Sequence, residues 1–171
     1  GKIPTDFFED NLIDPDQPKE LIIERGITEI KPDAFRGCNS LKKVTLPEGL
    51  KTIGSRAFQG CENLDYIEIP DTVTYLGRES FILCIKLKYV KLSKGLKSIN
   101  GSAFENCASL ESICIPEGVE AIHRYAFNFC GRLKTIMIPN SLKDISQMVS
   151  YAFPVKLVAM DDNPVIEEAV V

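Results

Sequence analysis

Cysteine has the greatest capacity for chemistry in this sequence, since a thiol can act as a nucleophile, form a disulfide or ligate a metal. The chain has 171 residues and six cysteines, and five of the six follow one another at intervals of 23: Cys38, Cys61, Cys84, Cys107 and Cys130. Gaps of that length match no zinc-binding motif. A fixed period of about 20 to 50 residues instead indicates stacked structural units. The spacing therefore favours an architectural role for this cysteine column.

Three states are open to the cysteine column. Units stacked at strand spacing would bring consecutive Cα atoms within the usual range for a disulfide, about 4.4 to 6.8 Å. Parallel side chains in register do not have the crossing geometry of a disulfide, however, and five cysteines would leave one unpaired. We therefore expect free, buried thiols that pack as small hydrophobic groups. Bridged pairs and metal ligation are the alternatives, and no metal or cofactor is predicted.

His123 is the single histidine, and Cys114 lies nine positions before it, so a thiol–imidazole pair must be considered. The repeat gives a simpler explanation, because His123 shares its position with Lys31, Gly54, Gly77 and Asn100. This column predicts a turn with a left-handed backbone, which Asn and His tolerate better than most residues. The same turn accounts for Asn100-Gly101-Ser102, which fits a glycosylation acceptor. We expect no enzymatic activity.

Composition excludes several classes of partner. With 44% hydrophobic and 26% charged residues, the chain has the composition of a folded globular protein. A net charge of -4 lacks the basic excess of a nucleic-acid-binding protein. No uncharged apolar stretch approaches the length of a membrane span, so membrane insertion of this segment is not expected. We expect one compact unit and a monomer.

Each 23-residue unit repeats its hydrophobic positions. An aromatic column precedes the cysteines by three residues, at Phe35, Phe58, Phe81, Phe104 and Phe127. The residue before each Phe is Ala, with Ser80 as the one exception. About eight apolar positions in 23 residues are too few for a separate core, so the units must stack to bury them.

The second unit shows the elements that are expected in every unit. Apolar and polar residues alternate around Val44-Thr45-Leu46, which predicts a strand. Pro47-Glu48-Gly49 predicts a turn, and Leu50 to Ile53 predicts a second short strand. Ala57, Phe58 and Cys61 have the spacing of one face of a short helix. Equivalent strands must run parallel and in register, because every unit presents the same pattern.

The repeat resembles a known family. The pattern Leu-x-x-Val-x-Leu-Pro-x-x-Leu-x-x-Ile-Gly-x-x-Ala-Phe-x-x-Cys looks like the BspA-like class of bacterial leucine-rich repeats, over roughly residues 18–145. The resemblance implies an α/β protein: a right-handed leucine-rich-repeat solenoid with a parallel β-sheet on one face, short second strands and short helices. It also implies a secreted or cell-surface protein that binds other proteins, adhesive or host-interacting, with no catalytic residues to carry over.

Three segments are expected along the chain. Residues 1–17 form an N-terminal half repeat or cap, because Ile3-Pro4-Thr5-Asp6-Phe7-Phe8 resembles the end of a unit and the four extra residues fall around 14–17. Residues 18–145 form the solenoid. Residues 146–171 hold a degenerate last repeat, a C-terminal cap and a tail. In that repeat Val155-x-x-Val158-x-Met160 predicts a strand, with Val158 and Met160 at the positions of Ile136 and Ile138. Because the chain begins in mid-pattern, we expect it to be a piece of a longer protein.

Function is sought on the strand face that the alternation turns outward. One outward column reads Glu20, Lys43, Tyr66, Tyr89, Ser112, Thr135, and the other reads Ile22, Thr45, Glu68, Lys91, Cys114, Met137. These positions are the least repetitive of the chain, and tyrosine with charged neighbours is typical of a protein-binding patch. The candidate binding residues are Lys43, Tyr66, Glu68, Tyr89 and Lys91.

The sequence leaves the role of this face and the compartment open. The face can also be an ordinary solvated sheet surface, and the chain an architectural spacer or an intracellular scaffold. Reduced cysteines in a secreted protein require an anaerobic setting or protective burial. Residence in the cytoplasm also explains them.

Overall fold

The backbone winds into a coil whose successive turns stack side by side. The structure is a computed structural model that describes residues 1–3, 19–143 and 155–160. One series of strands lies along one side of the coil: β2 (Lys19–Ile22), β4 (Leu41–Thr45), β6 (Tyr66–Glu68), β8 (Tyr89–Lys91), β10 (Ser112–Cys114), β12 (Thr135–Ile138) and β13 (Lys156–Ala159). A shorter series lies on a second side: β1 (Lys2–Ile3), β3 (Glu29–Ile30), β5 (Thr52–Ile53), β7 (Tyr75–Leu76), β9 (Ser98–Ile99) and β11 (Ala121–Ile122).

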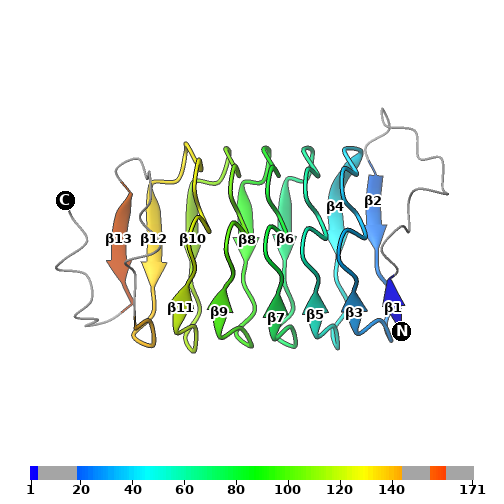
Figure 1. The fold of residues 1–171 in the computed structure, drawn as a ribbon, viewed down its shortest axis with the longest axis horizontal. Coiled ribbons are helices and arrows are strands. Elements are labelled where there is room, and N and C mark those ends of the chain that lie inside the picture. The colour runs from blue at the N-terminus through cyan, green and yellow to red at the C-terminus, as the bar shows by residue number, and fades with distance from the viewer. Residues whose placement is uncertain (4–18, 144–154, 161–171) are drawn as a thin grey trace.

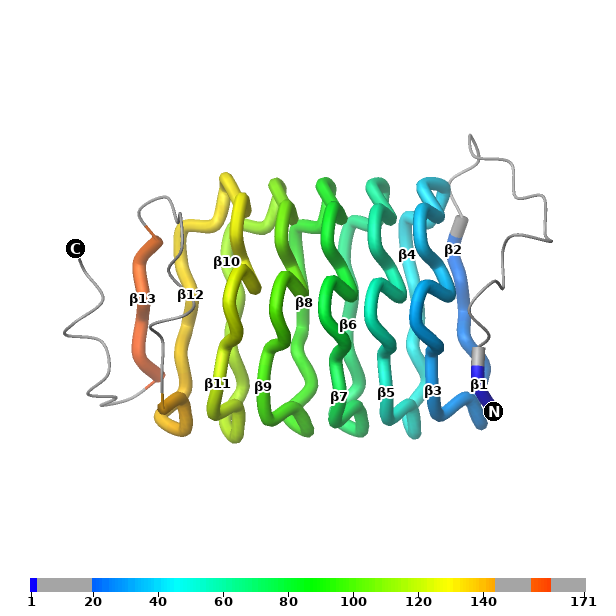
Figure 2. The backbone as a smooth tube through the Cα atoms, in the orientation of Figure 1, coloured from blue at the N-terminus to red at the C-terminus, as the bar shows by residue number. Residues whose placement is uncertain are grey.

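All strand pairs are parallel, and equivalent positions of neighbouring repeats face one another. Tyr66 pairs with Tyr89 and Ile67 with Val90, which are each 23 residues apart. The smooth tube of Figure 2 shows the coil advancing along one axis, and Figure 1 places β1 and β13 at its opposite ends. The prediction of a stacked parallel solenoid is confirmed.

The third side of the coil consists of tight turns, and the prediction of short helices is wrong. The N–H of Ala57 donates to the Gly54 carbonyl of its own repeat (3.3 Å), whereas the next N–H, of Phe58, donates to the Ser80 carbonyl of the following repeat (2.8 Å). A helix needs every N–H for its own i→i−4 bonds. Because alternate N–H groups here serve the neighbouring repeat, no helix forms at these positions in the described residues.

Two left-handed positions in each repeat bend this third side. One column has φ between 57° and 65° at Asp33, Arg56, Glu79, Ser102 and Tyr125. The other has φ between 55° and 70° at Gly37, Gly60, Leu83, Asn106 and Phe129. The column of His123 is not left-handed, so that prediction is wrong: the turn lies two residues later. L-residues in left-handed conformation interrupt a right-handed helix, which is a second reason for its absence.

Stacked phenylalanines form the centre of the core. Neighbouring rings in the column from Phe35 to Phe127 lie 5.1 to 5.7 Å apart between centroids, with interplanar angles of 1° to 15°. All five rings are buried. The column packs beside inward strand residues such as Ile67 and Val90. Each repeat thus contributes one layer, and its neighbours cover the upper and lower surfaces of that layer.

The cysteine column lies next to the phenylalanines and has a polar role that the sequence did not predict. In four repeats the thiol donates to the carbonyl of the Phe in the preceding repeat; the Sγ–O distance is 3.1 to 3.3 Å for Cys61, Cys84, Cys107 and Cys130. Predicted burial is confirmed for these four. Cys38 is only partly buried, because it belongs to the first complete repeat of the described stack. All six cysteines are free thiols.

Ser80 is a local defect in this core. It occupies the alanine column, is fully buried, and its hydroxyl has no hydrogen-bond partner. We expect Ser80→Ala to raise the free energy of unfolding by about 1 kcal/mol, because a buried hydroxyl without a partner is costly. Urea denaturation measures the change. Ser93→Ala is the matched control: the Ser93 hydroxyl donates to the Val73 carbonyl (2.6 Å) and accepts the Gly95 N–H (3.0 Å), so this change should destabilise by about 1 kcal/mol. Destabilisation by Ser80→Ala would contradict the prediction.

The last described strand exists as predicted but in a different register. β13 pairs with β12, and Ile136 faces Leu157 while Ile138 faces Ala159. The sequence pattern placed Val158 and Met160 at these inward positions, which is wrong by one residue. Leu157 packs against the core instead. Because strand side chains alternate, the shift turns Val158 and Met160 outward. The remainder of the predicted C-terminal cap, and the extra residues of the N-terminal half repeat, fall outside the described residues.

Candidate functional site

The outward face of the long strands is built by simple alternation. In β6 the central Ile67 is buried while Glu68 is exposed, and in β8 the central Val90 is buried between exposed Tyr89 and Lys91. The predicted inward and outward positions of these strands are confirmed. Tyr89 keeps 51% of its surface exposed, so its ring contributes little to the core.

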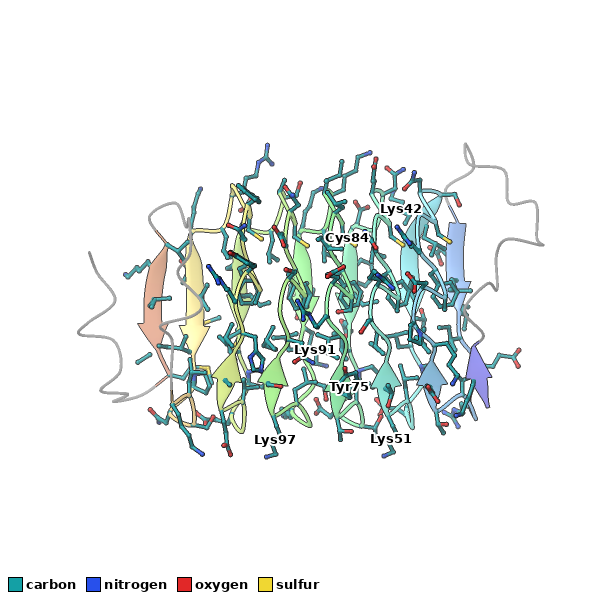
Figure 3. All side chains as sticks on the ribbon, viewed as in Figure 1. Lys42, Lys51, Tyr75, Cys84, Lys91 and Lys97 are labelled. Carbon is teal, nitrogen blue, oxygen red and sulfur yellow. The ribbon has the colours of Figure 1, made fainter. Side chains whose placement is uncertain are left out.

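The structure brings the five candidate residues together on β4, β6 and β8. Lys43 faces Tyr66, Tyr66 faces Tyr89, and Glu68 faces Lys91 across adjacent strands. Glu68 and Lys91 form an ion pair of 3.7 Å. A hydrogen bond with Tyr66 and the charge of Glu20 raise the pKa of Lys43. We call this group of five residues the tyrosine face. Figure 3 shows Lys91 between the edge of the coil that carries Lys42 and the edge that carries Lys97.

A shallow pocket of about 350 Å³ opens beside the tyrosine face. Tyr66, Glu68 and Lys91 contribute to its wall, and the turns that follow the strands add Glu48 and Asp71. Its apolar lining includes Val44, Leu46, Ile69 and Pro70. Sequence reasoning missed Glu48 and Asp71, because it considered only strand positions. Their shared place, just after the strand in successive repeats, was the available signal.

The thiols of the core are chemically protected. Burial raises the pKa of Cys61, Cys84 and Cys107 well above the ordinary value, that of Cys38 to about 11 and that of Cys130 to about 12. Thiolate is the reactive form, so these residues stay unreactive at neutral pH. In the part of the chain that the structure describes, no group of three or more His, Cys, Asp or Glu side chains could hold a metal ion.

The other sequence candidates are separated by the fold. Cys114 lies on the outward face at β10, whereas His123 follows β11 on another side of the coil. The two therefore do not form a nucleophile–base pair. Asn100 uses its side-chain amide to donate to the Leu76 carbonyl at 2.6 Å, so a glycan on that nitrogen would remove a bond within the coil. Among the described residues no helix is long and apolar enough to cross a membrane.

Native thiol labelling should separate these environments. We expect Cys114 to react rapidly with Ellman's reagent and the buried thiols to react only on unfolding, with six free thiols after denaturation without reductant. Partial burial raises the pKa of Cys114, so its labelling rate should continue to rise with pH above the usual thiol range. Cys114→Ser should remove the fast phase. Rapid native labelling of Cys84, identified by mass spectrometry, would show that the inward column is assigned wrongly.

The fold and the face define a class of protein: a parallel β-solenoid of about six turns with a leucine-rich core, whose variable residues lie on one strand face. The family model of the BspA type leucine rich repeat region matches six copies, over residues 7–130 and 51–163. The chain belongs to this family. The resemblance inferred from the repeat is thereby confirmed, and no curated protein matches the chain.

Solved structures with the same architecture come from several bacteria. A leucine-rich cell surface protein from Faecalibacterium prausnitzii is 25% identical, with a TM-score of 0.67 over 82% of this chain and 48% of that one. A leucine-rich repeat protein of T. pallidum is 27% identical, with a TM-score of 0.77 over 82% and 68%. The pneumococcal vaccine antigen PcpA is 28% identical, with a TM-score of 0.62 over 70% and 30%. The chain thus spans less than half of the first and third of these proteins.

Proposed function

We propose that the chain is a non-enzymatic protein-binding module and that the tyrosine face is its binding surface. The observation that carries the proposal is the pair of half-buried Tyr66 and exposed Tyr89 beside a pocket, on positions that the repeat does not need for folding. Tyrosine is enriched among the residues that dominate interface energies, because it buries a large ring and keeps a polar tip. Lys43, Glu68 and Lys91 border the rings and would supply specificity.

Display at the cell surface, or secretion, is part of the same proposal. It rests on similarity to a solved protein that is described as a cell surface protein. The buried thiols are compatible with an oxidising exterior, because the coil shields their sulfur atoms and burial keeps them protonated. An adhesive or host-interacting role is the finer form of this proposal.

The proposal is tested with a panel of candidate ligand proteins and biolayer interferometry. For a ligand that binds the parent chain, Tyr66→Ala/Tyr89→Ala should raise the Kd by about 30-fold or more, which corresponds to about 2 kcal/mol. Tyr75→Ala is the matched control, because Tyr75 is also exposed but lies on β7 in the other strand series. Thermal unfolding of each variant should remain cooperative.

Two results would contradict the tyrosine face. One is an unchanged Kd in the double variant. The other is a larger loss of affinity for the ligand in Tyr75→Ala than in the double variant. An architectural spacer is the second candidate function, favoured by the extended coil with β1 and β13 at opposite ends (Figure 1). If the chain is a spacer, binding of the proteins in the panel should not depend on any exposed aromatic residue.

A further inference from the structure

We propose that the outer surface of β10, β12 and β13 holds a binding site for a soft monovalent metal ion, Cu(I) or Ag(I), formed by Cys114, Met137 and Met160. This site is separate from the tyrosine face, which lies on β4, β6 and β8. The proposal therefore does not depend on the proposed protein-binding function.

The geometry begins with one contact between sulfur atoms. Cys114 Sγ lies 3.3 Å from Met160 Sδ. Cys114 is on β10 and Met160 directly follows β13, and β12 lies between these two strands. The two backbones are therefore about 10 Å apart, which is two strand spacings. The side chains must meet above β12, on the outward side of the sheet.

Met137 is the residue of β12 at that place. It is the register partner of Cys114, and it is the partly buried outward residue between buried Ile136 and Ile138. Its thioether therefore projects from the strand over which the other two sulfur side chains meet. The outward face here gathers three sulfur-containing side chains.

The register of β13 creates this arrangement. If β13 followed the sequence pattern, Met160 would align with Ile138 and point into the core. Ile138 instead pairs with Ala159, and the Met160 N–H donates to the Ile138 carbonyl at 2.9 Å. Met160 consequently points outward, toward Cys114. A one-residue shift reverses the face of every side chain in a strand.

The ligand set determines the metal. Thiolate and thioether sulfurs are soft ligands that select Cu(I), whereas Mg²⁺ and Ca²⁺ require oxygen ligands and structural Zn²⁺ usually requires four cysteine or histidine ligands. On binding, the Cys114 S–H bond breaks, its proton goes to solvent, and the thiolate forms a bond to the metal ion. The two thioethers donate electron pairs without losing a proton. One thiolate and one monovalent ion give a neutral complex, and no electron transfer is required.

The four buried column thiols do not compete for the ion, because each donates to a carbonyl inside the coil. Cys38 is partly buried, and this burial raises the pKa of its thiol to about 11. Cys114 is therefore the accessible thiol with sulfur neighbours in the described structure. This gives a clear set of variants for a test.

The test is an anaerobic titration of the reduced protein with Cu(I), in competition with the chromophoric chelator bicinchoninate. We expect one Cu(I) per chain, release of one proton below the thiol pKa, and affinity that rises with pH. Cys114→Ser should abolish this site. Met137→Leu and Met160→Leu, which preserve side-chain volume, should each weaken Cu(I) binding by about tenfold or more. Cys38→Ser is the control and should leave the affinity unchanged.

If both Met variants bind Cu(I) as tightly as the parent chain does, the thiol alone binds the ion and the proposal is overturned. Retention of the site in Cys114→Ser would also overturn it. X-ray absorption at the copper edge on the unmodified protein provides a second test that needs no variant. Three sulfur neighbours support the site, and a single sulfur neighbour contradicts it. Ag(I), which is not oxidised in air, should reproduce the one-to-one stoichiometry by calorimetry.

Discussion

Phe81→Ala should lower the free energy of unfolding by about 3 to 5 kcal/mol, the usual cost of removing a buried aromatic ring. Phe81 is fully buried between Phe58 and Phe104, with ring centroids at 5.2 and 5.4 Å. The neighbouring rings belong to other repeats and are held by their own backbone bonds, so the cavity cannot collapse easily. Stability in a solenoid depends on interfaces between adjacent repeats, and this change weakens two of them. Urea denaturation measures the loss.

Tyr89→Ala is the control for Phe81→Ala, because it also removes one aromatic ring from the middle of the coil. Tyr89 is half exposed, so its loss should cost less than about 1 kcal/mol. If the two variants lose similar free energies of unfolding, the phenylalanine column does not provide the main stabilisation of the core. A loss below about 1 kcal/mol for Phe81→Ala would lead to the same conclusion.

Gly77→Ala should destabilise the chain by about 3 kcal/mol, the upper part of the usual range for overpacking. A Cβ at position 77 would lie 2.3 Å from the Ser55 nitrogen and 2.5 Å from the Gly54 carbonyl carbon. These are backbone atoms of the preceding repeat, and the Gly77 N–H donates to that repeat through the Ile53 carbonyl at 2.8 Å. Relief of the clash would separate two repeats that this bond holds together.

Gly131→Ala is the matched control for Gly77→Ala. No atom lies within 4 Å of a Cβ built at position 131, and the backbone there is not left-handed. This change should alter the free energy of unfolding by less than about 0.5 kcal/mol. Equal urea midpoints for Gly77→Ala and the parent chain would mean that the repeats are not in close contact at this position.

The tyrosine face could be located from the sequence because it depends on alternation alone. Once Val90 is assigned inward, Tyr89 and Lys91 must be outward, and the period places Tyr66 beside Tyr89. Alternation alone does not locate the pocket, although the period places Glu48 and Asp71 at equivalent positions. Glu48 and Asp71 reach it from turns, and the direction of a turn depends on how the strand end and the next repeat pack together.

The sequence by itself determined the repeat, the parallel stacking and the inward columns, because a period of 23 residues requires every unit to bury the same positions. Only the tertiary structure decided which carbonyl groups accept hydrogen bonds from the backbone N–H groups of the turns. Ala57 to Cys61 have helical spacing, but the Phe58 N–H donates to Ser80 in the next repeat, and tight turns replace the helix. The register of β13 was decided in the same way, since Leu157 rather than Val158 fits against Ile136. Both outcomes depend on partners more than 20 residues away, which no local pattern contains.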